Sequence, residues 1–142
     1  MVWKGLQRGL YPERTTREER RAIGRNRMVR IGTYGDGAAT PTWVWTDLIA
    51  EAEGHTAYTH NRAPSTLFMR SADSLAQAQS AWQSNVRTFR VIHDATQLQP
   101  KQEILCPSDR GVQCVDCGLC AGSSIKAKSI AIVVHGPGAK HF

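Results

Sequence analysis

The sequence predicts an α/β fold: a mainly parallel sheet of about five strands, open or closed only into a partial barrel, with flanking helices and a cysteine-rich metal-binding loop. Strand-like and helix-like segments alternate along the chain, a pattern typical of parallel strands joined by helices. Five strands are too few for a closed eight-stranded barrel. A chain of 142 residues has the length of one domain, and residues 1–142 are therefore expected to form a single domain.

Residues 1–28 are expected to form a basic helical segment. Apolar residues at helical spacing predict a first short helix, docked onto the body by Trp3 and Leu6. Thr16 and Glu19 have the spacing of a capping box, and helix-forming residues follow them. A second, highly charged helix is therefore predicted.

A β-α-β core is predicted over residues 29–95. Its strands are expected in MVRIGTYG, HTAYTH, TLFMRSAD and VRTFRVIHD, and its helices in PTWVWTDLIAEAEG and SLAQAQSAWQSN. Ser74 is the expected N-cap of the second of these helices. The tryptophans of the two helices, Trp43, Trp45 and Trp82, are expected to be core or interface aromatics.

A polar connection, ATQLQPKQEIL, leads from this core to a four-cysteine metal loop at residues 106–122. Beyond the loop, SIAIVVHG is a continuous apolar run, which is typical of a strand buried on both faces of a parallel sheet. Residues 129–135 are therefore expected to be the final core strand.

All four cysteines lie within fifteen residues, as Cys106, Cys114, Cys117 and Cys120. The chain has no apolar run near the ~18 residues of a membrane span and no signal-peptide pattern. We therefore expect a cytoplasmic protein, in the host cell if the chain is viral, whose thiols stay reduced. Four thiolates complete a tetrahedral site, so the four cysteines are expected to bind one metal centre.

Two kinds of metal centre fit this spacing. Four cysteines are a standard ligand set for zinc, although zinc modules usually bring two separated Cys-x2-Cys pairs. The run CVDCGLC resembles the cluster-binding run of bacterial ferredoxins, in which a remote cysteine followed by proline supplies a ligand. Cys106 and Pro107 would play that part, although in ferredoxins the remote cysteine commonly follows the triplet. An iron-sulfur cluster (4Fe-4S) and Zn both stay open as cofactors.

Ionisable residues follow the predicted strands, at the edge of a parallel sheet where catalytic groups gather. The candidate catalytic residues are Asp36, His60, Asp73 and His135. Aspartate is also common in turns, and Asp73 could serve only to cap the following helix. The run GDGAATP lacks the lysine of a P-loop and is interpreted as a tight turn from strand to helix.

Positive charge is concentrated at the N-terminus. Residues 1–30 contain nine Lys or Arg and three Glu, which accounts for the whole net charge of +6. Such a segment either forms a solvated helix face or contacts a nucleic acid or host protein. The candidate contact residues are Arg14, Arg17, Arg20, Arg21, Arg25 and Arg27.

Several motifs together resemble an uncharacterised, mostly phage-encoded family that is related to the phage gene product eighty-eight group. They are RMVRIGTYGDGAATPTWVW, AYTH, FMRSADS, VRTFRV, CPSD, CVDCGLCAG and AKSIAIVVHG. The resemblance covers residues 2–136 and implies a viral or prophage origin, with the activity left open. Longer relatives carry a further cysteine-containing segment before the part that matches VWKGLQRGLYP, and the resemblance implies that this chain lacks it.

Two features of this family, the strand followed by Gly-Asp and the terminal cysteine cluster, are similar to features of radical enzymes that use iron-sulfur clusters and S-adenosylmethionine. The Cys-x3-Cys-x2-Cys loop of those enzymes is absent from this sequence. The likeness therefore implies a truncated, non-catalytic version of such an enzyme.

Two functions are predicted from these observations. The first is a small phage-type metal-binding protein that acts by binding a nucleic acid or host protein through its basic N-terminal segment. The second is an iron-sulfur redox or radical-type enzyme, or a truncated remnant of one, in which the candidate acids and histidines meet in one pocket near the cysteines. A third interpretation gives the metal a purely structural role.

Overall fold

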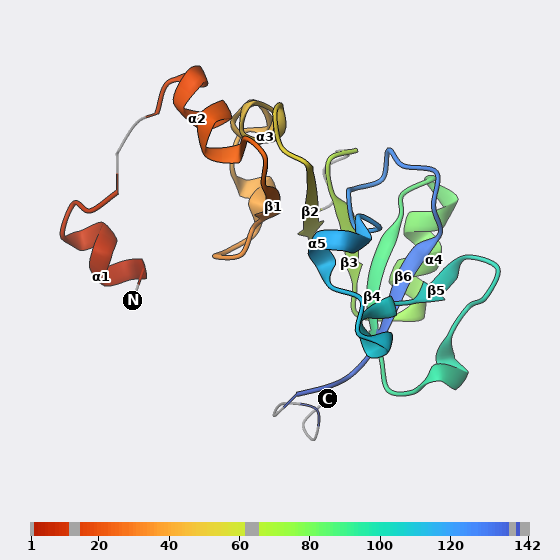
Figure 1. The fold of residues 1–142 in the computed structure, drawn as a ribbon. Coiled ribbons are helices and arrows are strands. Elements are labelled where there is room, and N and C mark those ends of the chain that lie inside the picture. The colour runs from red at the N-terminus through yellow and green to blue at the C-terminus, as the bar shows by residue number, and fades with distance from the viewer. Residues whose placement is uncertain (1, 12–14, 62–65, 137–138, 140–142) are drawn as a thin grey trace.

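The chain's structure, a computed structural model, describes residues 2–11, 15–61, 66–136 and 139. Within these residues, six strands form one open sheet in the order β1-β2-β3-β4-β6-β5, and every neighbouring pair is parallel. The strands are β1 (Met28–Ile31), β2 (Gly54–Thr59), β3 (Met69–Ala72), β4 (Thr88–Ile92), β5 (Glu103–Leu105) and β6 (Ser129–Val133). The prediction of an α/β fold with a parallel open sheet is therefore confirmed (Figure 1).

The sheet has one strand more than expected, because the polar connection contains β5. This strand is three residues long, begins with the buried Glu103, and pairs with β6. A strand this short that starts with a charged residue lacks the apolar pattern by which strands are recognised in a sequence.

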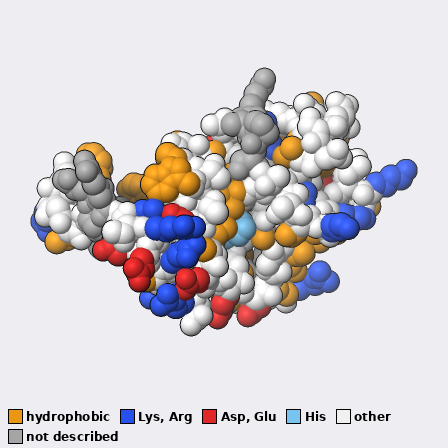
Figure 2. Space-filling model, turned by 90° about the horizontal axis from the view of Figure 1, so that it is seen from above, with side chains coloured by type: hydrophobic (Ala, Val, Ile, Leu, Met, Phe, Trp, Pro, Cys, Tyr) orange, Lys and Arg blue, Asp and Glu red, His pale blue; other side chains and the backbone are white. Residues whose placement is uncertain are grey.

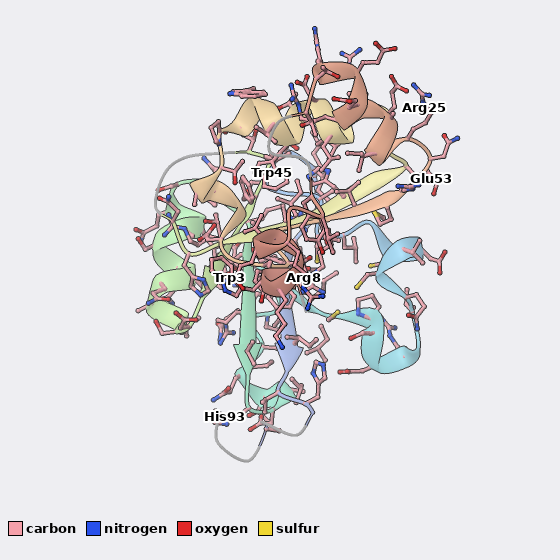
Figure 3. The ribbon with its side chains drawn as sticks, turned by 90° about the vertical axis from the view of Figure 1, so that its left-hand side faces the viewer. Trp3, Arg8, Arg25, Trp45, Glu53 and His93 are labelled. Carbon is pink, nitrogen blue, oxygen red and sulfur yellow. The ribbon has the colours of Figure 1, made fainter. Side chains whose placement is uncertain are left out.

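Helices lie on both faces of the sheet. The helices of the core are α3 (Thr42–Ile49), α4 (Leu75–Gln83) and α5 (Cys114–Cys117), and short 3-10 turns are η1 (Gly37–Ala39), η2 (Ala95–Gln97) and η3 (Pro107–Arg110). Figures 1 and 3 show α4 on one face of the sheet and α5 on the opposite face. The chain between β5 and β6 therefore forms a wall over the face that α4 leaves free.

The predicted charged helix is α2 (Arg17–Gly24), which packs against α3. Its capping box is confirmed, because the Glu19 amide donates to Thr16 Oγ1 at 3.2 Å and the Thr16 amide donates to Glu19 Oε2 at 2.7 Å. At Gly24 a Cβ atom would lie 1.7 Å from the Leu48 carbonyl oxygen. Glycine at this position thus permits the close approach of α2 and α3.

The first helix, α1 (Val2–Gln7), does not dock through the side chains predicted to do so. Trp3 is 59% exposed and Leu6 is 53% exposed, and Figure 1 shows α1 apart from the sheet. Gly5 is buried, and the side chain nearest to it belongs to Tyr11 just beyond the helix. The docking prediction is wrong because α1 packs on the chain that follows it.

The expectation that the tryptophans are core or interface aromatics holds for two of the three. Trp45 and Trp82 are half-buried, and Trp82 Nε1 donates to Ser129 Oγ at 2.9 Å. Trp43 is 57% exposed, so it is not a core residue. Its ring instead lies under the guanidinium of Arg20, 4.6 Å from the ring centroid, on the outer side of α3.

Alternation along β6 gives the sheet two different faces. Ser129 points to the α4 side, where it bonds Trp82, whereas Ile130 packs with Met69 and Cys120 on the opposite side. The expectation that the final strand is buried on both faces holds for its first three residues. Ile132 is only half-buried because it faces an open pocket.

Candidate functional site

A pocket of about 530 Å³ lies over the face of the sheet opposite α4, and all four cysteines line it. One wall is residues 106–122, here called the cysteine segment. Its floor is formed by side chains of β2, β3, β4 and β6, among them Tyr58, Ser71, Phe89, Val91, Ile130 and Ile132. Figure 3 shows sulfur atoms between the cysteine segment and the strands. The strand alternation therefore builds a floor that is mainly aromatic and aliphatic.

Short turns bring the cysteines to this pocket. Cys106 directly follows β5, and its amide donates to the Ala131 carbonyl of β6 at 2.7 Å. Cys114 and Cys117 are the first and last residues of α5, and a separation of three residues places them on the same side of a helical turn. Gly118 then takes a left-handed conformation with φ of 63°, which ends the turn and directs the chain back to the sheet.

The buried Arg87 anchors the far end of the cysteine segment. This residue precedes β4 and is 7% exposed. Its guanidinium donates to the carbonyl oxygens of Leu119, Gly122 and Lys128, each at 2.7 Å. Its positive charge also acts on the Cys120 thiol. Arg87 thus fixes the backbone on both sides of Cys120 and places a cation beside the pocket.

The Tyr58 phenol and the Cys120 thiol both line the pocket, and each acts on the ionisation of the other. Burial raises the pKa of the Cys120 thiol, although the Tyr58 phenol and the charge of Arg87 oppose this effect. Burial also raises the pKa of the Tyr58 phenol. Both groups are therefore protonated near neutral pH, and a metal that bound Cys120 would have to displace a proton.

The cysteines fit a metal centre by their chemistry. Thiolates are the preferred ligands of zinc and of iron-sulfur clusters, and all four thiols are free of disulfide bonds. In the part of the chain that the structure describes, no group of three His, Cys, Asp or Glu side chains lies close enough together to hold a metal ion. The four-cysteine metal centre therefore stays a prediction.

Three of the four candidate catalytic residues line the same pocket. His60 follows β2 and Asp73 follows β3, and His60 Nε2 lies 3.3 Å from Asp73 Oδ1. His135, which follows β6, also lines the pocket, with its Nδ1 2.9 Å from the Val133 carbonyl oxygen. The parallel sheet thus brings together strand ends that are 13 and 62 residues apart in the sequence.

Asp36, the fourth candidate, contacts one of these three residues, His60, through a hydrogen bond from its backbone amide. Its Oδ2 accepts hydrogen bonds from Thr59 Oγ1 at 2.9 Å and from the His60 amide at 3.0 Å, while Oδ1 accepts from the Ala38 amide at 2.9 Å. Burial opposes ionisation of Asp36, but these hydrogen bonds outweigh it and lower the pKa of the carboxyl. Asp36 therefore joins the GTYGD turn to the end of β2 and positions His60.

Two residues of the site, Tyr58 and Arg87, were missed by reasoning from the sequence. Tyr58 is two residues after Thr56 and two before His60, and residues two apart in a strand point to the same face. This period of two could have placed Tyr58 on the same face as His60. Arg87 gives no such signal, because its carbonyl partners lie 32 to 41 residues further along the chain.

Most of the candidate partner-contact arginines make contacts within the protein. Arg17 Nε and Arg20 Nη2 bind Asp47 of α3 at 3.1 and 2.9 Å. Arg25 Nε binds Glu51 at 2.6 Å. The view from above in Figure 2 shows basic and acidic side chains intermixed on this part of the surface.

Of the remaining arginines of this set, the two that the structure describes, Arg21 and Arg27, do not form such ion pairs. Arg27 Nη1 donates to the Ile23 carbonyl at 2.9 Å, and Arg21 Nε is a buried nitrogen without a hydrogen-bond partner among the described residues. Arg14 lies outside the described residues. The contact with a nucleic acid or host protein stays a prediction, and the α2–α3 ion pairs give part of the basic segment a structural role.

No protein-family model matches the chain, no curated protein matches it, and no solved structure matches it. The resemblance to the phage-encoded family therefore stays a prediction. Among the described residues, none of the helices has the length and apolar character that crossing a membrane requires.

Proposed function

We propose that this chain is an iron-sulfur protein whose cluster forms one wall of a small-molecule pocket. Cys106, Cys114, Cys117 and Cys120 would be the cluster ligands. The observation that carries the proposal is that all four cysteines, which are spread over fifteen residues, line a single pocket together with the His60–Asp73 pair. A purely structural metal would need neither an open pocket nor ionisable groups at the strand ends.

The spread of the cysteines favours a cluster over a single ion. With a Zn–S bond of about 2.3 Å, the four sulfurs around one zinc lie about 3.8 Å apart. The described side chains do not form a group that tight, although all four thiols surround one space. A cluster of four irons holds its cysteine ligands further apart than one ion does, which fits thiols that line one pocket without forming a group tight enough for a single ion.

The chain's own residues would tune and serve this centre. When bound, such a cluster exchanges single electrons with a redox partner. Tyr58 supplies a hydrogen-bond donor to Cys120, and Arg87 supplies a fixed positive charge beside the same sulfur. His60 Nε2 and Asp73 Oδ1 lie 3.3 Å apart at the pocket edge, and Asp36 positions His60 by accepting a hydrogen bond from its amide.

The test is anaerobic purification of the full chain, followed by an absorption spectrum and by iron, sulfide and zinc analysis. A brown protein that absorbs near ~400 nm, with about four irons and four sulfides per chain, is the expected result. Cys→Ser substitution at each of the four positions should abolish or sharply reduce this absorption.

Val115→Ala is the matched control, because Val115 lies in α5 between two of the cysteines and is 56% exposed. This variant should keep the full iron content. One equivalent of zinc without iron would overturn the cluster, and a chain that binds neither metal through its cysteines would overturn the proposal as a whole.

A further inference from the structure

One cation of the pocket, Arg30, has no hydrogen-bond or ion-pair partner for its side chain in the part of the chain that the structure describes. Arg30 is on β1, paired in register with Thr56 of β2, and both residues line the pocket. Among the described residues, no carboxylate and no other hydrogen-bond acceptor is bound to its guanidinium. Its register partner Thr56 shares a face of β2 with Tyr58, so Arg30 is on the same side of the sheet as the pocket floor.

The one carboxylate that lines the described pocket is already engaged. Asp73 Oδ1 lies 3.3 Å from His60 Nε2. Asp73 follows the last residue of β3, so it is at the end of the pocket floor where the strands end. Arg30 therefore contributes a positive charge that is not balanced by a neighbouring acid. A guanidinium of this kind is suited to bind a carboxylate through two parallel hydrogen bonds.

Next to Arg30 the floor of the pocket is apolar. The rings of Tyr58 and Phe89 lie with their centroids 4.7 Å apart at an angle of 54°, and this surface continues through Val91, on the same strand as Phe89, and Ile132, on the neighbouring strand β6. The volume of about 530 Å³ is within the range of sites for small organic ligands. An apolar body would therefore bury surface against these side chains while an acidic group reached Arg30.

We propose that the pocket binds a small organic acid, with its carboxylate on Arg30 and its apolar body on the Tyr58–Phe89 surface. This assignment deepens the proposed function, and only the role of the bound acid rests on that function, because the acid would lie beside the cysteine centre. The binding itself depends on Arg30 and the sheet, not on a metal.

The experiment compares three probes that share a phenyl ring and a three-carbon chain and differ in the terminal group: 3-phenylpropanoate, 3-phenylpropan-1-ol and 3-phenylpropan-1-amine. Their dissociation constants are measured by ligand-detected NMR titration on the full chain as purified, with the metal content determined on the same sample. We expect the acid to bind about tenfold more tightly than the alcohol, because it adds charge-assisted hydrogen bonds. The amine should bind most weakly.

Arg30→Gln should reduce the affinity for the acid to that for the alcohol and leave the alcohol unchanged. Arg8→Gln, which removes an exposed arginine of the N-terminal segment, is the matched control and should keep the preference for the acid. Equal binding of acid and alcohol, preference for the amine, absence of binding by all three probes, or an unchanged preference in Arg30→Gln would each overturn the inference.

The two proposals fail in different ways. A sample without iron that still prefers the acid would overturn the cluster and keep the acid site. A brown sample that shows no preference for the acid would keep the cluster and overturn the acid site.

Discussion

Arg90 of β4 and Glu103 of β5 form a buried ion pair that reaches across the intervening strand β6. Arg90 Nε lies 2.9 Å from Glu103 Oε1, and Arg90 Nη2 lies 2.6 Å from Oε2. In register, both side chains flank the small residues Ser129 and Ala131 of β6, which leave room for the contact. The pair holds β5, the edge strand that directly precedes Cys106. It therefore supports the start of the cysteine segment from the opposite face of the sheet.

Removing one partner of this pair should destabilise the fold strongly. Glu103→Ala would leave the Arg90 guanidinium buried without its carboxylate, a change that costs about 3–5 kcal/mol of unfolding free energy in comparable cases. Urea unfolding followed by circular dichroism measures the loss. Glu51→Ala, which breaks the exposed pair with Arg25, is the control and should have a much smaller effect.

The double variant Arg90→Met with Glu103→Leu should recover part of the stability lost in Glu103→Ala, because it removes both buried charges together. A Glu103→Ala variant as stable as the unaltered protein would contradict the structural role of the pair.

This pair also shows why local reasoning recovered only part of the fold. The periodicity of VRTFRVIHD and the capping residues Thr16 and Ser74 identify their elements, because those signals are local in the sequence. β5 depends on Glu103 meeting a residue thirteen positions earlier, and no pattern within its three residues indicates this.

The candidate site was predictable to a similar degree. A parallel sheet collects its strand ends at one edge, so the meeting of His60 with Asp73 follows from the order of strands and helices. The placement of Arg87 depends on how the cysteine segment folds back over the sheet. Likewise, whether the arginines of α2 face solvent or form ion pairs with Asp47 depends on how α2 packs on α3, which the sequence does not show.

Loss of Arg87 should release the cysteine segment. Arg87→Met keeps much of the side-chain length but removes the donors to Leu119, Gly122 and Lys128, so the buried Cys120 should become accessible. Site-resolved alkylation by iodoacetamide, read by mass spectrometry on the reduced protein, should show Cys120 reacting at least about tenfold faster.

The already exposed Cys114 is an internal control in this experiment, because its rate should change little. Arg110→Met removes an exposed arginine of the same segment and should leave both rates unchanged. An unaltered rate at Cys120 in Arg87→Met would show that other contacts hold the segment in place.

His55 should make stability depend on pH in the weakly acidic range. Burial lowers the pKa of its imidazole in the folded chain, although a hydrogen bond to the Leu67 carbonyl opposes the effect. The unfolded chain, with an ordinary pKa of about 6.5, binds the proton more readily than the folded one. The contribution of neutral His55 is therefore complete above that value and is lost as pH falls from it through the folded pKa.

Urea unfolding at a series of pH values tests this dependence. His55→Gln should flatten the fall in stability between about pH 7 and pH 5, while the two proteins should show parallel behaviour between about pH 7.5 and pH 9. If the variant loses stability with the same slope as the unaltered protein in the lower range, protonation of His55 is not the cause.

The ion pairs of α2 lead to a test of the basic segment as a partner surface. Asp47→Asn should weaken the packing of α2 on α3, because Arg17 and Arg20 both lose their carboxylate. The same change frees two guanidinium groups, so binding to a generic DNA duplex should become stronger and more steeply dependent on salt than in the unaltered protein. Thermal unfolding measures the first effect, and fluorescence anisotropy at several salt concentrations measures the second.

The opposite outcome is that the unaltered protein already binds DNA tightly at physiological salt and that reversing the charges of Arg17 and Arg20 abolishes this binding. In that case these arginines contact the nucleic acid in spite of their pairing with Asp47.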